Sequence, residues 1–192
     1  MKNSVLKSHF SSVLATVFLF LPAASFSMQL GELSMAGPGC FGSGKIVAIS
    51  GQDGRYAIPM RVRVNKKAEV AFDRKSCQVR IPVTLASNEK LQLVEASQVV
   101  RVVSQKDADI KTNLTLGLVG RGSKTASFQF KAVEEETSHI EIVKSEGLIS
   151  ESDCGKSTML SGNLNALVTG TNAQAFVSTG ALMLTLRVVS CD

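Results

Sequence analysis

The feature that most constrains this chain is a hydrophobic period of two, which returns in segment after segment from Gly44 to the C-terminus. Successive side chains of an extended strand point to opposite faces, so this pattern predicts strands with one face in a core and one face in water. A helix would instead place apolar residues three and four positions apart. The alternating apolar residues are Ile58, Met60, Val62 and Val64; Val79, Ile81, Val83 and Leu85; Leu114, Leu116 and Leu118; Phe128 and Phe130; Ile140 and Ile142; Leu164, Ala166 and Val168; and Leu182, Leu184, Leu186 and Val188.

Short turn sequences rich in glycine, asparagine and serine separate these segments, at residues 51–54, 65–67, 87–90, 120–123 and 171–172. Many strands with regular turns, and no helical stretch between them, predict an all-β fold, an antiparallel β-sandwich of about eight to ten strands. Pro59 and Pro82 cannot donate a hydrogen bond to a ladder, so we expect them at sheet edges or bulges. Residues 28–192 are predicted to form one domain, in which residues 28–37 show no pattern and are expected to be loosely held.

The first 27 residues have the three parts of an export signal. Lys2 and Lys7 carry positive charge, residues 13–21 are apolar, and small residues at Ser25 and Ser27 follow. The apolar run is shorter than the ~20 residues that span a bilayer. We predict a signal peptide over residues 1–27, with cleavage after Ser27, or after Ala24 or Ser25; a retained N-terminal anchor is the alternative. No later segment is long and apolar enough to span a membrane, so the protein is predicted to be secreted or periplasmic.

Length and charge narrow the range of partners. Removing 27 of the 192 residues leaves 165, which suits one domain with a real core. The signal contains two lysines, so the net charge falls from +5 to +3. Nucleic-acid binders usually carry a larger and clustered basic excess, so we predict no nucleic-acid partner. Acidic envelope polymers or another protein remain as candidate partners.

All four cysteines, Cys40, Cys77, Cys154 and Cys191, follow the signal. An even number of cysteines in an exported chain indicates disulfides, and four cysteines allow three pairings. We favour Cys40–Cys77 and Cys154–Cys191, because each pair then closes a loop of similar size within one half of the chain. A zinc site is the competing interpretation, but no pair has C-x-x-C spacing and His139 is the only histidine after the signal. We predict no metal site and no cofactor.

Glycines flank the first cysteine in Gly39-Cys40-Phe41-Gly42-Ser43, and residues 74–78 read Arg-Lys-Ser-Cys-Gln. The first motif is similar to the glycine-flanked first cysteine of the secreted DUF4360 family, and the second is similar to that family's basic R-K-x-C-Q element. Asp153-Cys154-Gly155 and residues 187–191 resemble its third and last cysteines. The family tends to carry an aromatic residue before the last cysteine, whereas residues 188–190 are Val-Val-Ser here. The resemblance implies an exported, disulfide-bonded β domain and implies no reaction.

Two motifs invite catalytic interpretations. Gly155-Lys156-Ser157-Thr158 resembles the end of a phosphate-binding P-loop, but Ser150 stands where the loop needs its first glycine, so we favour a turn. His139 could serve as a general base. The period of two places it with Glu141 on the outward face of its strand, and no serine lies in a G-x-S-x-G motif. An ordinary exposed histidine is the favoured interpretation, and we assign no catalytic residue.

Four arginines are candidates for a basic surface, because Arg61, Arg63, Arg80 and Arg101 all stand at outward positions of predicted strands. If they align, they form a stripe able to bind phosphate or carboxylate groups. If acidic residues lie opposite them, they form ordinary cross-strand pairs.

These observations favour an exported, non-catalytic β-sandwich that acts by binding or as an envelope component. Two alternatives remain open. The first is a secreted hydrolase whose site gathers His139 with an acid and a serine from distant parts of the chain. The second is a subunit of a surface assembly that uses an exposed edge strand.

Overall fold

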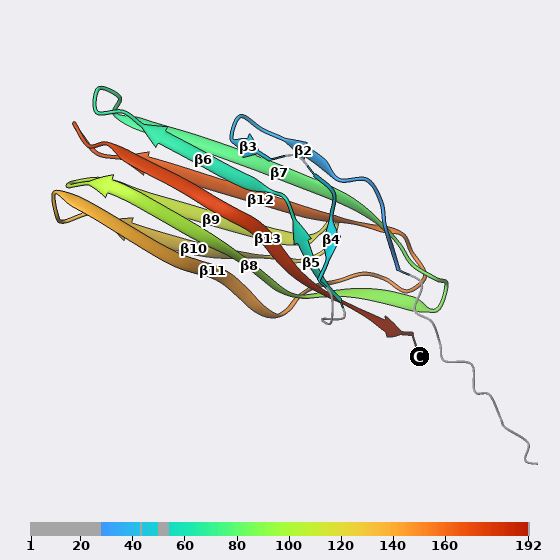
Figure 1. Cartoon of the computed structure of the whole chain (residues 1–192). Coiled ribbons are helices and arrows are strands. Elements are labelled where there is room, and N and C mark those ends of the chain that lie inside the picture. The colour runs from blue at the N-terminus through green and yellow to red at the C-terminus, as the bar shows by residue number, and fades with distance from the viewer. Residues whose placement is uncertain (1–27, 43, 50–53, 192) are drawn as a thin grey trace, which may run out of the picture.

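Two antiparallel sheets packed face to face contain most of the residues described in this computed structural model, which are residues 28–42, 44–49 and 54–191. The predicted signal peptide, residues 1–27, lies outside the described residues. The strands are β1 (Gln29–Leu30), β2 (Ser34–Ala36), β3 (Cys40–Phe41), β4 (Val47–Ala48), β5 (Arg55–Ile58), β6 (Arg61–Lys66), β7 (Phe72–Thr84), β8 (Glu89–Gln105), β9 (Asp109–Leu118), β10 (Ser123–Lys131), β11 (Glu136–Glu151), β12 (Thr158–Thr169) and β13 (Ala175–Ser190) (Figure 1).

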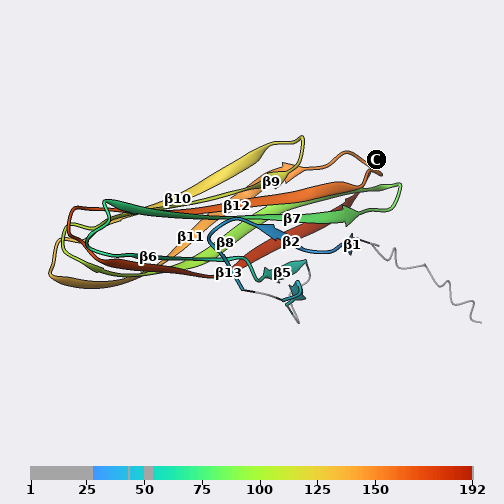
Figure 2. The ribbon, with the colours of Figure 1, turned by 90° about the horizontal axis from the view of Figure 1, so that it is seen from above.

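Sheet 1 has the strand order β1-β7-β12-β9-β10, with β2 also pairing with β7. Sheet 2 has the order β11-β8-β13, after which β6 and β5 both pair with β13, β3 pairs with β6 and β4 pairs with β5. Figure 2 shows β10, β9, β12 and β7 in one layer and β11, β8, β13 and β6 in the other. The predicted antiparallel β-sandwich is confirmed, with nine described strands of four or more residues.

The core lies between the sheets and is built by the alternating residues that the sequence pattern identified. On β7 the side chains of Val79, Ile81 and Val83 are at most 1% exposed, while the intervening Arg80 and Pro82 are exposed. On β13 Leu182 and Leu184 are equally buried. Burial of apolar area at ~25 cal/mol per Å² is the main favourable term for such a fold. One face of each sheet is therefore occupied by the core, and function is left to the outer faces and the edges.

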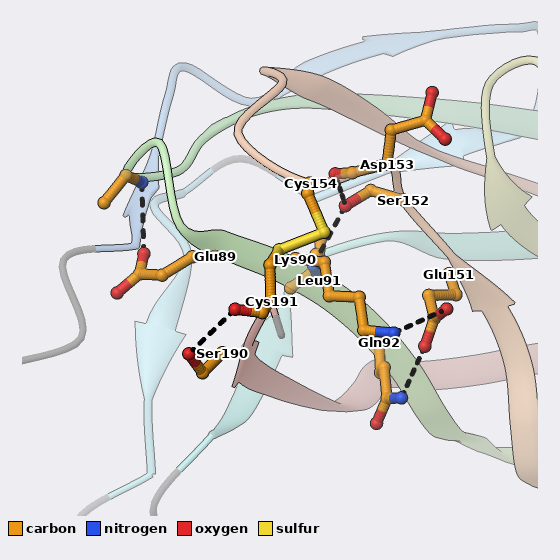
Figure 3. Close-up of a disulfide and its surroundings, with 11 residues drawn as sticks. Glu89, Lys90, Leu91, Gln92, Glu151, Ser152, Asp153, Cys154, Ser190 and Cys191 are labelled. Atoms are coloured by element: carbon orange, nitrogen blue, oxygen red, sulfur yellow. Dashed lines mark hydrogen bonds and ion pairs between the residues drawn. A yellow bond between two sulfur atoms is a disulfide. The ribbon is translucent and has the colours of Figure 1, made fainter.

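Both favoured disulfides are present, and both join cysteines that are 37 positions apart in the sequence. Cys40–Cys77 connects β3 of sheet 2 to β7 of sheet 1, and so crosses between the two layers. Cys154–Cys191 ties the segment after β11 to the end of β13, beside the start of β8 (Figure 3). Structural disulfides of this kind are typical of proteins that fold in oxidising compartments.

The glycines beside two cysteines are required because the backbone of another segment lies against them. A Cβ atom on Gly39 would come within 2.6 Å of the Lys75 Cβ, and the Gly39 amide donates to the Ser76 carbonyl at 3.0 Å. Gly155 has φ of +63°, and a Cβ there would lie 2.4 Å from the Ser87 carbonyl oxygen. Each glycine lets its segment approach closely enough for the neighbouring disulfide to form.

Two expectations about local structure need refinement. Residues 28–37, expected to be loosely held, contain β1 and β2, which pair with β7. Strands of two or three residues are too short to show a period of two, so the sequence carried no signal for them.

Pro82 lies in β7 opposite the break between β1 and β2, where the Gly31 amide donates to its carbonyl at 2.8 Å, and Pro59 lies in the gap between β5 and β6. Both prolines thus stand where no neighbouring strand needs their missing amide.

Candidate functional site

The outer face of sheet 2 gathers side chains that sequence analysis treated separately. Arg63 of β6 and Arg101 of β8 both have Ser178 of the intervening β13 as their Cα partner. Ile140 of β11 is the next partner of Arg101. These four residues form one row across the sheet, in which one strand separates the two arginines. At the usual strand spacing the Cα atoms of Arg63 and Arg101 are therefore about 10 Å apart.

Aromatic side chains flank one end of this row. The guanidinium carbon of Arg63 lies 4.2 Å from the centre of the Phe41 ring and 5.6 Å from the centre of the Phe176 ring. Phe41 follows Cys40 directly, and both residues belong to β3, so the disulfide to Cys77 fixes the backbone that carries this ring. Arginine stacked on aromatic faces keeps its charge and its donors while its conformational freedom is reduced. The Arg63 side chain is thus held in place by two aromatic rings.

Aliphatic side chains occupy the rest of the same face, although they are accessible to water. Ile140 and Ile142 of the edge strand β11 are 58% and 57% exposed, and Val103 and Val99 of β8 are 44% and 37% exposed. Register places Val103 beside Phe176, and Val99 beside Ile142. We call this surface the arginine face; it consists of Phe41, Arg61, Arg63, Val99, Arg101, Val103, Ile140, Ile142 and Phe176.

The arginines of this face are not neutralised by the protein itself. Within the described residues, Arg61, Arg63 and Arg101 form no ion pair. Two acidic side chains of sheet 2 lie further along the strands, where Glu95 accepts from the Thr185 hydroxyl at 3.2 Å and Glu146 pairs with Lys144 at 2.8 Å. Asp73 of β7 lines the same cavity as Arg63 but pairs with Lys75 at 3.5 Å. The hydrogen bond to Glu146 and its negative charge raise the pKa of Lys144 above the ordinary value. The centre of the face therefore has a net positive charge.

Beyond Phe176 the face ends in a cavity of about 340 Å³. Its lining includes the amide side chains of Asn65, Gln105 and Gln174, together with Glu136 at the start of β11. Polar groups thus border the aromatic end of the arginine face.

Arg80, the fourth arginine of the predicted stripe, does not join the others. It lies on β7, in sheet 1, and its side chain is exposed on the opposite side of the sandwich from the arginine face. The chain crosses between layers after β6, so the outward direction reverses although the alternation continues. The neighbouring outward side chains of sheet 1 are mostly neutral amides and hydroxyls, including Gln78, Asn163 and Thr115. The basic surface therefore contains three of the four predicted arginines.

The predicted orientation of the segment around His139 is wrong. His139 and Glu141 do lie together, with Nε2 and Oε2 3.4 Å apart, but they are on the side of β11 that faces β10. The His139 ring stacks on Phe128 and Phe130, at 5.5 and 4.9 Å between ring centres. Ile140 and Ile142, expected in the core, are on the outer face instead. No serine or threonine hydroxyl in the described part of the chain is hydrogen-bonded to His139, so a nucleophile and base pair is not assembled there.

The Gly155-Lys156-Ser157-Thr158 motif forms a turn between β11 and β12, as predicted. Asp153 lies between Arg121 and Lys156, and the Lys156 Nζ is 3.6 Å from its carboxylate. Among the described residues no group of three or more histidine, cysteine or acidic side chains is arranged to hold a metal ion. No helix in the described ranges is long and apolar enough to cross a membrane.

Glu151, near the second disulfide, accepts hydrogen bonds from Gln92 at 2.5 Å and from Lys90 at 3.1 Å (Figure 3). These two hydrogen bonds, and the positive charge of Lys90, lower the pKa of the Glu151 carboxyl below its ordinary value. Glu89 is 4% exposed, and its carboxylate accepts from the Ala86 amide at 3.1 Å. This region holds the β7–β8 turn and the end of β13 together, which is a structural role.

Sequence reasoning identified the three arginines of the face but not its apolar members. One signal was available, because residues 99–103 read Val-Val-Arg-Val-Val and so place apolar side chains on both faces of β8. Nothing local marks Phe41, which becomes part of the face only through the pairing of β3 with β6.

No family model and no curated protein matches this chain. Among solved structures it is similar to TmCBM61 in complex with β-1,4-galactotriose, at 8% identity over 82% of this chain and 88% of that chain, with a TM-score of 0.27. It is also similar to a family 11 carbohydrate-binding module from Clostridium thermocellum in complex with a mixed-linked tetrasaccharide, at 12% identity over 86% and 91% of the two chains, with a TM-score of 0.23.

Proposed function

We propose that this is an exported, non-catalytic binding protein whose arginine face holds an anionic partner. The observation that carries the proposal is the presence, on the outer face of sheet 2, of three arginines that form no ion pair with any described residue. A single-sign cluster repels itself and is usually interspersed with acids, so its counter-charge is expected from another molecule.

The geometry of the face suits a partner with repeated negative charges. Arg61 and Arg63 stand two residues apart on β6, which is about 7 Å along a strand, and Arg101 lies about 10 Å away across the sheet. The guanidinium fork binds carboxylate or phosphate through two parallel hydrogen bonds, and such charge-assisted bonds are stronger than neutral ones. Apolar neighbours such as Val103 and Phe176 lower the local polarity around each charge.

Secretion or periplasmic location belongs to the same proposal. It is supported by the basic, apolar and small-residue segments of residues 1–27 and by the two disulfides. Mass spectrometry of the protein recovered from its native compartment tests it. We expect a mature N-terminus at Met28, or a few residues earlier, and no free thiol; an intact N-terminus with four free thiols would contradict the proposal.

The binding test uses poly-L-glutamate as a defined polyanion and measures its affinity at low and at physiological ionic strength. The test variant is Arg63→Gln/Arg101→Gln. The matched control is Arg74→Gln/Arg80→Gln, which removes the same charge from exposed positions of β7 on the other sheet. We expect the test variant to lose affinity about tenfold or more and to become less salt-dependent, and the control to change less than about twofold.

Equal losses in the two variants would show that net charge alone attracts the polymer, and would overturn the assignment of the face. No arginine-dependent binding of any polyanion would overturn the proposed function.

A further inference from the structure

We infer that the partner of the arginine face is an acidic protein surface that presents apolar side chains among its carboxylates. This inference rests on the proposed function and specifies the class of partner. It is carried by the composition of the face, its shape and its charge.

The composition combines two requirements that a purely anionic polymer meets only in part. The arginines require negative charge in the partner, but Ile140, Ile142 and Val99 lie beside Arg101 and would not be buried by a hydrophilic chain. Burial of these apolar side chains is favourable only if the partner presents an apolar surface opposite them. Protein interfaces are enriched in arginine, aromatic and apolar residues and depleted in lysine. The arginine face has this composition, since its nine residues include no lysine, whereas ten of the described residues elsewhere on the chain are lysines at exposed or half-buried positions.

The partner is a different chain rather than a second copy of this one. A symmetric dimer through this face would bring the same patch of both copies together. Such an interface would hold six arginines, three from each copy, and none of the nine residues of the face is acidic. Glu136 and Asp73 lie only at its border. Like charges brought together in this way oppose association.

The size of the face indicates a transient complex. Five strands at the usual spacing, covered over three outward rows, give about 500 Å² on this side. Stable interfaces bury about 800 Å² per partner, and smaller ones are typical of short-lived encounters. Two exposed isoleucines on the edge strand β11 extend the contact to the border of the sheet, where the partner meets no obstacle from neighbouring strands. We therefore expect affinity in the micromolar range.

The experiment compares polyanionic probes that differ in apolar content: poly-L-glutamate, polygalacturonate, a random copolymer of glutamate and tyrosine, and vesicles of phosphatidylglycerol. We expect the copolymer to bind about tenfold or more tightly than poly-L-glutamate and polygalacturonate. The variant Ile140→Ser/Ile142→Ser keeps every charge and should lose this preference, while its affinity for poly-L-glutamate stays within about twofold. Because both isoleucines are more than half exposed, this variant is expected to fold normally.

The outcomes separate the two proposals. Arginine-dependent binding of all polyanions with equal affinity would leave the proposed function standing and overturn this inference. Stronger binding to the vesicles than to the copolymer would also overturn it, in favour of a lipid surface. If the Ile140→Ser/Ile142→Ser variant still binds the copolymer more tightly than poly-L-glutamate, the apolar contact lies elsewhere on the protein. That result would also overturn the inference.

Discussion

The two disulfides close loops of equal length, which allows a matched test of what each one does. In the chain-entropy model, cross-linking residues 37 positions apart removes about 4 kcal/mol of conformational entropy from the unfolded chain at 25 °C. Chain entropy therefore predicts the same loss of stability for Cys40→Ala/Cys77→Ala and for Cys154→Ala/Cys191→Ala. Any difference between the two variants must come from the folded state.

The folded state differs because the first disulfide lies against the core and the second does not. Cys77 is fully buried on β7, whereas Cys154 is exposed. Replacing a buried sulfur with hydrogen leaves a small cavity, which adds about 1 kcal/mol. Urea unfolding of the oxidised wild type and of both variants should therefore show losses of about 5 kcal/mol for the first pair and about 4 kcal/mol for the second.

The same variants test the link between the first disulfide and the arginine face. Loss of Cys40–Cys77 releases the two-residue strand β3 and with it Phe41, so affinity for the glutamate–tyrosine copolymer should fall several-fold under conditions in which the variant remains folded. Loss of Cys154–Cys191 should leave that affinity unchanged, because no residue of the face is attached to this bond. If both variants lose affinity equally, or if the first variant is the more stable one, the reasoning about β3 is refuted.

Three further results follow from local contacts. Gly155→Ala should lower the free energy of unfolding by about 2–4 kcal/mol, because φ is positive there and the new Cβ would lie 2.4 Å from a backbone oxygen. Gly120→Ala, also at positive φ but with nothing within 4 Å of the new Cβ, should lower it by about 1 kcal/mol. Chemical denaturation of both variants measures the difference. Ile140→Ser/Ile142→Ser should change the unfolding free energy by less than about 1 kcal/mol, and a larger loss would show that these side chains are core after all. The depressed pKa of Glu151 contributes stability that is present above its unfolded value of 4.5 and is lost as pH falls through the lower folded value. Glu151→Gln should therefore be slightly destabilising at pH 7, by at most about 0.5 kcal/mol because solvent screens this half-buried site, and should match the wild type in strong acid. An equal difference at both pH values would contradict this reasoning.

The fold was readable from the sequence because burial in a sandwich has the same period as the backbone. Val79, Ile81 and Val83 on β7 could only be buried together, and the turns between strands fixed the boundaries. The disulfide pairing was readable from loop lengths. The strand pattern and the disulfide pairing both depend on the spacing of residues along the chain, which can be taken directly from the sequence.

The period of two identifies which residues share a face, but it does not say which face is inside. On β11, Ile140 and Ile142 alternate with His139 and Glu141, and hydrophobicity alone assigned the isoleucines to the core. At this edge the inner side is filled by Phe128 and Phe130 of β10, on which the His139 ring stacks. The aromatic rings of the opposite sheet supply a surface that accepts an imidazole, so the isoleucines are left on the outside. This choice depends on a contact between layers that no local pattern records.

The arginine face depends on the same kind of long-range information. Arg61 and Arg80 both stand at outward positions of their own strands, yet they point to opposite sides of the molecule because the chain changes sheets between β6 and β7. The Cys40–Cys77 bond joins β3 of sheet 2 to β7 of sheet 1 and holds Phe41 near Arg63. The Cys40–Cys77 disulfide thus both joins the two layers and completes the arginine face. Replacing its two cysteines with alanine should therefore lower the stability of the fold and its affinity for the copolymer together.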